Sequence, residues 1–432
     1  DIPQGYKQTE LGIIPEDWEI VNLGSVAKIN GRIGFRGYTT ADLVGVGQGA
    51  YTIGGKHITN MVLDLHDAEY ISWQKYYESP EIMVRKGDIV FAQRGTLGKS
   101  AFIVNDIGPA TINPSLVLIN KIKCDNEYLS YWLQCDKIVE YICSINSQTS
   151  IPMITQNQIE HIPVVLSRIK AEQQAIAEAL GDIDGLIAAL DKKIAKKRLI
   201  KQGAMSQLLT GKKRLPGFSD PWVEKKLGEI GYTYSGLTGK SKDDFGQGDA
   251  KYITFLNVLA NPILKENLFG SITIRENEQQ NKVQFGDLFF NTSSETPEDV
   301  GTCAVLLSYH EELYLNSFCF GYRLTDDNVL GLYLAYYFRS RLGRQLMTSL
   351  AQGATRYNLS KELFNASRII LPETKDEQIG IATMLNDMDK EIDDLEAQRD
   401  KYRLLKSGMM QKLLTGQIRL TKPLTNVVPL VP

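Results

Sequence analysis

Two long stretches of the chain carry apolar residues at alternating spacings of four and three positions. This spacing gathers the apolar side chains on one face of an α-helix. At 1.5 Å per residue, a pattern held for about 35 residues gives a helix of roughly 50 Å. An amphipathic helix lying on a globular core is the alternative, and we favour a seam between two helices. The apolar positions are Ile176, Leu180, Ile183, Ile187, Leu190 and Ile194 in the first stretch, and Ile381, Leu385, Met388, Ile392 and Leu395 in the second.

Short β-type runs precede each of these helices. The first set is "DIVFAQ", "AFIVN" and "SLVLIN", and the second is "KYITFLNV", "DLFFN" and "CAVLL". Gly, Asn and Ser turns separate the runs. A shorter helix-like stretch follows in both places, as "EYLSYWLQCDKIVEYI" and "LGLYLAYYFRSRLGRQLM". The pattern therefore predicts a mixed globular region followed by a long helix, twice.

The two halves of the chain are copies of one module. "QLLTGKKRL" at 207–215 returns as "KLLTGQIRL" at 412–420, and "AEQQAIAEALGDID" at 171–184 returns as "DEQIGIATMLNDMD" at 376–389. "KGDIVF" at 86–91 returns as "FGDLFF" at 285–290, at a smaller displacement. Insertions and deletions therefore fall in the globular regions, while the helices keep their length. The repeat unit is about 205 residues.

The two long helices carry opposite charge. Residues 191–201 hold six basic residues and one acid, whereas residues 386–400 hold seven acids and two basic residues. Opposite charges favour packing of one helix against the other. The expected fold is α+β: two globular mixed α/β domains in tandem repeat, separated by two long antiparallel coiled-coil-like helices, with pseudo-twofold symmetry.

Composition narrows the classes of function. The chain of 432 residues is 43% hydrophobic, with a net charge of −3, which suits two to three ordinary globular domains. No run reaches the roughly 18 apolar residues of a membrane span. Five cysteines without CxxC, and no signal-like start, indicate reduced thiols and a cytoplasmic protein. No histidine lies in HExxH or at zinc spacing, so we expect no metal site.

The stretch "AQRGTLGKS" at 92–100 ends like a nucleotide-binding P-loop. A complete P-loop needs a glycine where this chain has Gln93, and a helix after GKS. The β-type run "AFIVN" follows instead, so we expect strand, turn and strand. An ATPase remains one alternative hypothesis, and a coiled-coil adaptor without DNA contact is another.

Two rigidly spaced, twofold-related domains would suit a reader of two DNA half-sites. Polar and basic loops in both copies supply side chains that can bond phosphates and base edges, although such loops are also ordinary surface turns. The candidates are Lys28, Asn30, Arg32, Arg36, Lys56, His57, Arg94, Gly95, Thr96 and Lys99 in the first copy, and Tyr234, Ser235, Lys240, Lys242, Asn291, Thr292, Ser293, Ser294, Gln352, Thr355, Arg356 and Tyr357 in the second.

Several segments together resemble the specificity (S) subunit of type I restriction-modification systems. They are "TELGIIPEDWEIVNLGSVAKI", "GDIVFAQRGTLGKSAFI", "SIPMITQNQIEHIPVVLSRIKAEQQAIAEAL", the second copy's "ATRYNLSKELFNASRIILPETKDEQIGIATML" and the repeated "LLTG". The resemblance spans essentially the whole chain. It implies target-recognition domains at 1–170 and 213–374, a central spacer helix at 171–212, a distal spacer helix at 375–416 and a tail at 417–432.

The resemblance also implies a division of labour. Each recognition domain would read half of a bipartite target in double-stranded DNA, and the helices would set the spacing and bind two adenine-methylating modification subunits. Restriction subunits would join through the complex. The chain itself would catalyse nothing and hold no cofactor, with S-adenosylmethionine, ATP and Mg on its partners. In agreement, it has no [DN]PP[YFW] motif, complete P-loop or PD…ExK cluster.

The loop after "GDIVFA" looks like a DNA-approaching hairpin of that family, so Arg94, Gly95, Thr96 and Lys99 inherit this role. The second copy departs here, because "NTSSETPEDVGTCAV" contains Glu295, Glu298 and Asp299 but no Arg or Lys. We expect this copy to read DNA through 291–294 or through other loops. The two domains should therefore recognise different sequences.

Overall fold

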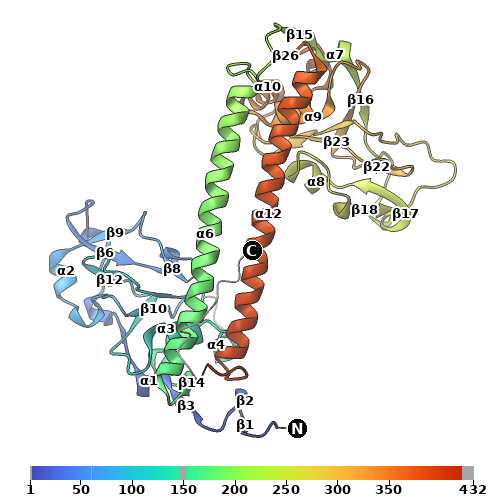
Figure 1. The fold of residues 1–432 in the computed structure, drawn as a ribbon. Coiled ribbons are helices and arrows are strands. Elements are labelled where there is room, and N and C mark those ends of the chain that lie inside the picture. The colour runs from blue at the N-terminus through green and yellow to red at the C-terminus, as the bar shows by residue number, and fades with distance from the viewer. Residues whose placement is uncertain (1, 60, 146–151, 421–432) are drawn as a thin grey trace. The chain divides into compact units, whose positions relative to one another are not determined.

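The computed structural model describes residues 2–59, 61–145 and 152–420. The chain forms two compact units: unit 1 comprises residues 1–190 and 398–432, and unit 2 comprises residues 191–397. The two predicted long helices are present as α6 (Lys170–Leu208) and α12 (Lys375–Leu413), each of 39 residues (Figure 1). Each unit thus combines one globular region with parts of both long helices.

Unit 1 contains two four-stranded sheets, of order β11-β10-β13-β4 and β12-β6-β9-β5. The first is antiparallel throughout, and β12 runs parallel to β6 in the second. Strand β10 is buried on both faces, which explains its unbroken apolar sequence. The strands are β4 (Lys28–Gly31), β5 (Leu43–Val44), β6 (Gly49–Ile53), β9 (Glu69–Ser72), β10 (Ile89–Ala92), β11 (Ser100–Phe102), β12 (Ala110–Ile112) and β13 (Leu116–Asn120).

Shorter elements complete unit 1. Three two-stranded pairs form between β1 (Tyr6–Thr9) and β2 (Gly12–Pro15), between β3 (Trp18–Asn22) and β14 (Pro163–Ser167), and between β7 (Ile58–Thr59) and β8 (Val62–Leu63). The short helices are α1 (Leu23–Val26), α2 (Trp73–Tyr77), α3 (Asn126–Trp132), α4 (Asp136–Ile145) and α5 (Gln156–Glu160).

Unit 2 repeats this topology. Its four-stranded antiparallel sheet has the order β21-β19-β23-β16, which corresponds strand for strand to the sheet of unit 1. A second sheet, β18-β17-β22, again contains one parallel pair. The strands are β16 (Gly231–Ser235), β17 (Phe245–Ile253), β18 (Phe269–Ile272), β19 (Leu288–Asn291), β21 (Cys303–Val305), β22 (Leu313–Leu315) and β23 (Cys319–Leu324).

The remaining elements of unit 2 include one feature that the sequence did not separate. The helix-like stretch "LGLYLAYYFRSRLGRQLM" forms two helices, α9 (Gly331–Arg339) and α10 (Arg341–Leu350). They are separate because the Ser340 hydroxyl accepts from the Gly343 amide and caps the start of the second helix. Strands β15 (Trp222–Lys226) and β26 (Arg368–Pro372) pair, and β20 (Ser293–Ser294), β24 (Ala351–Gln352) and β25 (Tyr357–Leu359) form a small sheet. The other short helices are α7 (Leu227–Ile230), α8 (Phe255–Ala260) and α11 (Lys361–Ala366).

The first turns of each long helix pack into a globular core. In unit 1, Ile176 and Leu180 are fully buried in one cluster with Trp132. In unit 2, Ile381 and Leu385 are buried in the corresponding cluster. These first turns therefore fit the alternative expectation of an amphipathic helix that lies on a globular core. The apolar face that contacts the core continues along the helix as the seam. The last residue of the other long helix and the residue after it join each cluster. They are Leu413 and Leu414 in unit 1, and Leu208 and Leu209 in unit 2.

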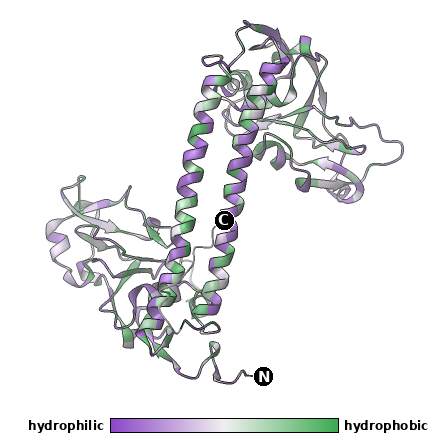
Figure 2. Cartoon of the chain, in the orientation of Figure 1, coloured by the Kyte–Doolittle hydropathy of each residue, from purple (hydrophilic) through white to green (hydrophobic). Residues whose placement is uncertain are grey.

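Farther along, α6 and α12 exchange ion pairs within unit 2. Lys197 Nζ lies 2.6 Å from a Glu391 oxygen, and Lys201 pairs with Asp389. Residue numbers rise along α6 as they fall along α12, so the two segments of this unit run in opposite directions. Polar and apolar positions alternate along both helices (Figure 2). In unit 2, the seam residues Ile194, Ile392 and Leu395 are buried outside the main core cluster.

A buried carboxylate at the start of each long helix is bound by an arginine that follows the other long helix. In unit 1, Arg419 Nε donates to Glu172 at 2.7 Å, and Glu172 is only 1% exposed. In unit 2, Arg214 donates to Glu377 in the same way, at 2.5 Å from Nε. Each globular region is therefore completed at its base by residues from the end of the other copy's helix.

A second contact also recurs in both units. The Tyr131 hydroxyl donates to Asp184 at 2.8 Å, and Lys406 pairs with the same carboxylate while lying 5.2 Å from the Tyr131 ring centroid. This contact fastens α3 to both long helices within unit 1. The corresponding residues of unit 2 are Tyr336, Asp389 and Lys201.

Candidate nucleic-acid interface

The stretch that resembled a P-loop forms a β-hairpin in unit 1. Strands β10 and β11 pair antiparallel, with residues 93–99 as the connecting loop. The expected order of strand, turn and strand is confirmed. Gly95 and Gly98 adopt φ values of 79° and 76°, where a residue with a Cβ is strained. Because a strand follows GKS, the phosphate-binding helix N-terminus of a P-loop is missing here.

The base of this hairpin borders a hollow of about 410 Å³. Arg32 and Arg94, far apart in sequence, both line it. Arg94 is exposed, and its backbone amide donates to the Ser115 carbonyl, which fixes the turn beneath the side chain. Thr96 and Lys99 are exposed farther along the same loop. The hairpin thus presents two cations and a hydroxyl beside a concave surface.

Arg32 forms the buried wall of this hollow rather than a mobile cation. Its guanidinium donates to the Ile112 carbonyl at 3.2 Å and to Thr111 Oγ1 at 3.0 Å, and it lies 5.1 Å from the Tyr38 ring centroid. Burial lowers the pKa of Arg32. These contacts leave Arg94 as the lining arginine that is able to reach a ligand.

The corresponding place in unit 2 is a hollow of about 560 Å³. The small sheet of β20, β25 and β24 brings the predicted loops 291–294 and 352–357 together there. Arg356 Nε donates to Ser293 Oγ at 3.3 Å, which links the two loops directly. Ser294 lines the same hollow. Gln352 and Thr355 are exposed but do not line it, and Tyr357 is half-buried in β25.

Asn291 anchors the inserted loop of unit 2. The side chain is 1% exposed. Its oxygen accepts from the Thr302 amide at 2.6 Å, and its amide group donates to the Asp299 carbonyl at 3.1 Å. The Thr292 hydroxyl is also used internally, because it donates to the Phe318 carbonyl. Both residues hold the loop in shape.

Several predicted residues of unit 1 do not line the hollow. Asn30 is buried and its amide donates to Asn120 at 3.1 Å. His57 is 2% exposed and accepts from the Gly54 amide, and its burial lowers its pKa. The side chains of these two residues are bonded within the interior of the domain. Lys28 is exposed on β4, Lys56 pairs with Asp67 at 3.3 Å and Arg36 pairs with Glu81 at 3.5 Å.

In unit 2, two predicted residues are likewise engaged inside the fold. The Tyr234 hydroxyl donates to Asp287 at 2.6 Å, and burial raises the Tyr234 pKa well above its usual value. The Lys240 side chain is 4% exposed and pairs with Glu278. Neither group is available to a nucleic acid. Lys242 is exposed, and the Ser235 hydroxyl accepts from Lys361 at 3.2 Å.

The hollows are also lined by residues that the loop patterns of the sequence do not predict. In unit 1 they are Gln93 and, from the segment before α5, Thr155 and Gln156. The signal in the sequence was the capping box of Thr155 and Gln158, which predicts a helix start at this place. In unit 2, the added residues are Glu295, Thr296, Asp299 and Thr302 from the inserted loop, with Phe255 and Leu259 from α8.

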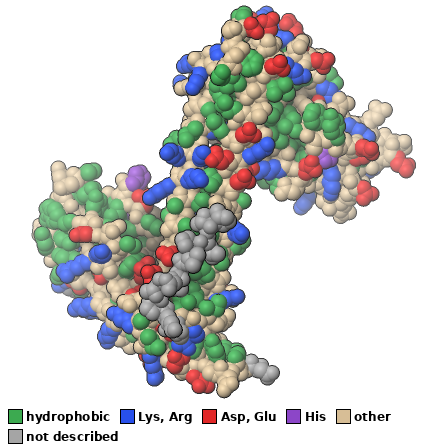
Figure 3. Space-filling model, in the orientation of Figure 1, with side chains coloured by type: hydrophobic (Ala, Val, Ile, Leu, Met, Phe, Trp, Pro, Cys, Tyr) green, Lys and Arg blue, Asp and Glu red, His purple; other side chains and the backbone are tan. Residues whose placement is uncertain are grey.

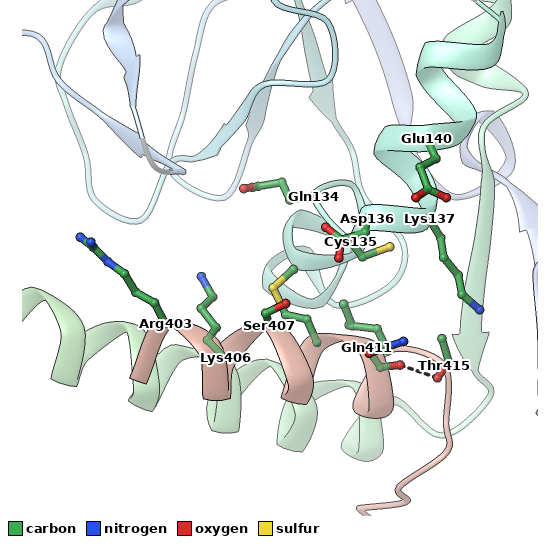
Figure 4. Close-up of a pocket in the computed structure, with 12 residues that line it drawn as sticks. Gln134, Cys135, Asp136, Lys137, Glu140, Arg403, Lys406, Ser407, Gln411 and Thr415 are labelled. Atoms are coloured by element: carbon green, nitrogen blue, oxygen red, sulfur yellow. Dashed lines mark hydrogen bonds between the residues drawn. The ribbon is translucent and has the colours of Figure 1, made fainter. Parts of the chain in front are cut away.

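Another hollow in unit 1, of about 470 Å³, lies between α4 and the end of α12 (Figure 4). Met410, Leu414 and Cys135 give it apolar surface, while charged side chains such as Lys137 and Glu140 lie at its edge. None of the predicted DNA-facing residues lines this hollow.

The charged side chains form no single basic face on the side drawn in Figure 3, where acidic and basic groups are interspersed. Any DNA contact there would therefore be local. Across residues 2–59, 61–145 and 152–420, no three His, Cys, Asp or Glu side chains gather as a metal site. Among these residues, too, every helix is too short or too polar to span a membrane.

Comparison with known proteins identifies the repeated module. The model of the type I restriction modification DNA specificity domain matches residues 15–197 and again residues 219–402. The specificity subunit of the putative type I restriction enzyme MjaX from Methanocaldococcus jannaschii is 25% identical, over 96% of this chain and 97% of its own length. The MjaVIII specificity subunit of the same organism is 23% identical, over 96% of each chain.

Solved structures share the fold. The S subunit of a type I restriction-modification system from M. genitalium superposes with a TM-score of 0.57 and 14% identity, covering 92% of this chain and 96% of its own. A chain from a study of complex assembly and conformational transition in a type I system superposes with a TM-score of 0.55 and 15% identity, covering 94% of this chain and 99% of its own. Two mixed α/β domains in tandem are therefore a shared architecture.

Proposed function

Because the chain belongs to the family of type I restriction-modification specificity subunits and carries two of its recognition domains, we propose that each domain reads one half of a bipartite DNA target. The observation that carries this proposal is the pair of hollows at equivalent places in the two copies. Each borders the end of an equivalent strand, β10 or β19, but the lining differs. Hollows at equivalent positions but with different lining residues suit two domains that read different DNA sequences.

The two long helices act as the spacer between the halves of the target. The ion pairs between α6 and α12 in unit 2 support an antiparallel arrangement. In unit 1, a lysine of α12 likewise pairs with an aspartate of α6, Lys406 with Asp184. A direct repeat packed in this way has pseudo-twofold symmetry, which matches the dyad relation of the two backbones of duplex DNA. The spacing of the half-sites would then follow from helix length.

The chain contributes recognition and no catalytic step. Methyl transfer from S-adenosylmethionine and ATP- and Mg-dependent translocation take place on partner subunits. The hairpin after β10 supports this division, since its glycines present Arg94 and Lys99 without the helix that a nucleotide site needs. These two cations contact the DNA backbone or a base edge.

DNA binding by the assembled methyltransferase complex tests the role of this hairpin. Lys99→Ala should weaken binding to all sequences and reduce the slope of log affinity against log salt by about 1. Arg94→Ala should cost about 1–3 kcal/mol and relax the preference at one position of the target. The measurement is a titration of a labelled target duplex at several salt concentrations.

Lys86→Ala is the matched control, because Lys86 is an exposed lysine at the other end of β10. It should leave both affinity and salt slope unchanged. Equal effects at Lys86 and Lys99 would contradict a localised contact, and ATP binding by the isolated chain that Lys99→Ala abolishes would favour the enzyme hypothesis instead.

The modification subunits dock on the exposed apolar residues of the long helices. Leu404 and Leu405 of unit 1 are 76% and 51% exposed, and Leu199 and Ile200 of unit 2 are 69% and 48% exposed. These pairs occupy the same position in the two copies. Apolar residues repeated at equivalent exposed positions favour two equivalent docking places, which agrees with two modification subunits.

Substitution of one pair at a time tests this docking. Leu404→Glu with Leu405→Glu should reduce the complex from two modification subunits to one, since a buried charge disfavours association. Mass measurement of the purified complex gives the stoichiometry. The equivalent change at Leu199 and Ile200 should do the same, whereas Leu186→Glu, at another exposed position of α6, is the control. Two bound subunits in both double variants would contradict the docking surface.

A further inference from the structure

The hollow of unit 2 contains charges of both signs. Glu295 and Asp299 line it together with Arg356. The hollow of unit 1 has Arg32 and Arg94 as its charged lining residues and no acid. A carboxylate that faces DNA is repelled by the phosphates, so an acid in this place calls for a specific partner on the ligand.

Two of the three charged groups in the unit 2 hollow remain available to a ligand. Asp299 accepts from Thr296 Oγ1 at 2.6 Å and is used to shape the loop. Glu295 is exposed and makes no hydrogen bond or ion pair within the described part of the chain. Arg356 is exposed and bonds Ser293 only through Nε, which orients the guanidinium and leaves its two terminal amino groups for a ligand.

The base edges of DNA determine what such a pair can read. In the major groove, the hydrogen-bond donors are the N4 amino group of cytosine and the N6 amino group of adenine. Adenine places the acceptor N7 beside its donor, where a second carboxylate oxygen would be repelled. Guanine presents two acceptors, O6 and N7, which match the two donors of an arginine. A C·G base pair therefore offers a donor for Glu295 and acceptors for Arg356.

We propose that Glu295 accepts a hydrogen bond from cytosine N4 and that Arg356 donates to O6 and N7 of the paired guanine, so that unit 2 reads a C·G base pair in its half-site. This inference rests on the proposed function of unit 2 as a DNA reader. Asn291 and Asp299 hold the loop that carries Glu295, and Ser293 positions Arg356. Glu295 also rejects guanine and thymine at the cytosine position, because their major-groove oxygens would face a carboxylate.

The test is the methylated sequence produced by the complex of this chain with its modification subunits, determined by methylome sequencing. For Glu295→Gln, we expect the cytosine preference at one position of one half-site to fall roughly 10-fold or more, and to shift toward adenine, which a glutamine binds through N6 and N7. For Arg356→Ala, discrimination should be lost at the same position. The other half-site should not change.

Glu298→Gln is the matched control, because Glu298 is an exposed acid of the same loop that does not line the hollow. It should leave the methylated sequence unchanged. An unchanged sequence for Glu295→Gln, or a change in the half-site of unit 1, overturns the inference while the proposed function stands. A wild-type complex that methylates no two-part sequence overturns the proposed function itself. Rates of methylation on duplexes that vary only at that position give a second readout for Arg356→Ala.

Discussion

A chain whose residues 221–372 are exchanged for the equivalent segment of a relative with another target is expected to methylate a sequence altered in one half only. The segment includes every sheet described in unit 2 and all residues that line the hollow proposed to bind DNA. Unit 1 has its own core and its own hollow. Because neither hollow borrows a side chain from the other, each half of the target should be read independently.

The boundaries of the exchange follow from the contacts at the base of unit 2. Arg214 binds the buried Glu377, and its guanidinium also donates to the Asp220 carbonyl. An exchange that began at 213 would risk this pair, whereas one that begins at 221 retains it. Strands β15 and β26 pair with each other, so an exchange ending at 372 moves both together.

Methylome sequencing of a host that expresses the exchanged chain with its modification subunits gives the result directly. The reciprocal exchange of residues 17–167 should alter the other half alone. A change in both halves, or in neither, would show that the recognition domains are not divided in this way.

Removal of the Arg419 side chain is expected to destabilise unit 1 strongly. In Arg419→Met, Glu172 would keep its bonds from Ser167 and Trp18 but lose the cation that faces it. Breaking a buried ion pair by removing one partner costs about 3–5 kcal/mol, since an uncompensated charge stays buried. Urea unfolding followed by tryptophan fluorescence measures this loss. The double variant Arg419→Met, Glu172→Gln should recover a part of it.

The control is an exposed ion pair of the long helices. Arg198 pairs with Glu396 at 2.5 Å, but the arginine is 62% exposed. Such a pair contributes about 0–1 kcal/mol, so Arg198→Met should leave the urea midpoint nearly unchanged. Equal losses for Arg198→Met and Arg419→Met would contradict the distinction between a buried and an exposed pair.

The pH dependence of the Arg419→Met effect has a definite sign. Burial opposes ionisation of Glu172, but the bonds from Arg419 and Ser167 outweigh it and lower the pKa below its usual 4.5. In the wild type, this carboxylate therefore stabilises the fold above pH 4.5, and the contribution is lost as the pH falls through the lowered pKa. Without Arg419, burial should raise the Glu172 pKa. The destabilisation should be largest at neutral pH and shrink toward pH 4.

Much of the candidate interface followed from loops that are visible in the sequence. The hairpin at 93–99 and the loops at 291–294 and 352–357 border the two hollows. The burial of individual side chains does not follow from the sequence in the same way. Lys240 and Tyr234 are in loop-like sequence, yet they bind Glu278 and Asp287, which lie 38 and 53 residues farther along the chain. The residues next to a lysine in the sequence do not show whether it has such a distant partner. A buried lysine and an exposed lysine therefore cannot be told apart from the local sequence.

The sequence by itself determined the direct repeat, the two long helices and the family, because periodicity and recurrence are properties of the linear chain. Only the tertiary structure decided how the copies complete each other. Arg419 binds Glu172 across 247 residues, and Arg214 binds Glu377 across 163. Both the arginine and the carboxylate recur with the repeat, but their recurrence along the chain does not say which arginine binds which carboxylate. These pairs arise because the end of each long helix joins the core at the start of the other, where an arginine neutralises a carboxylate that the core has buried.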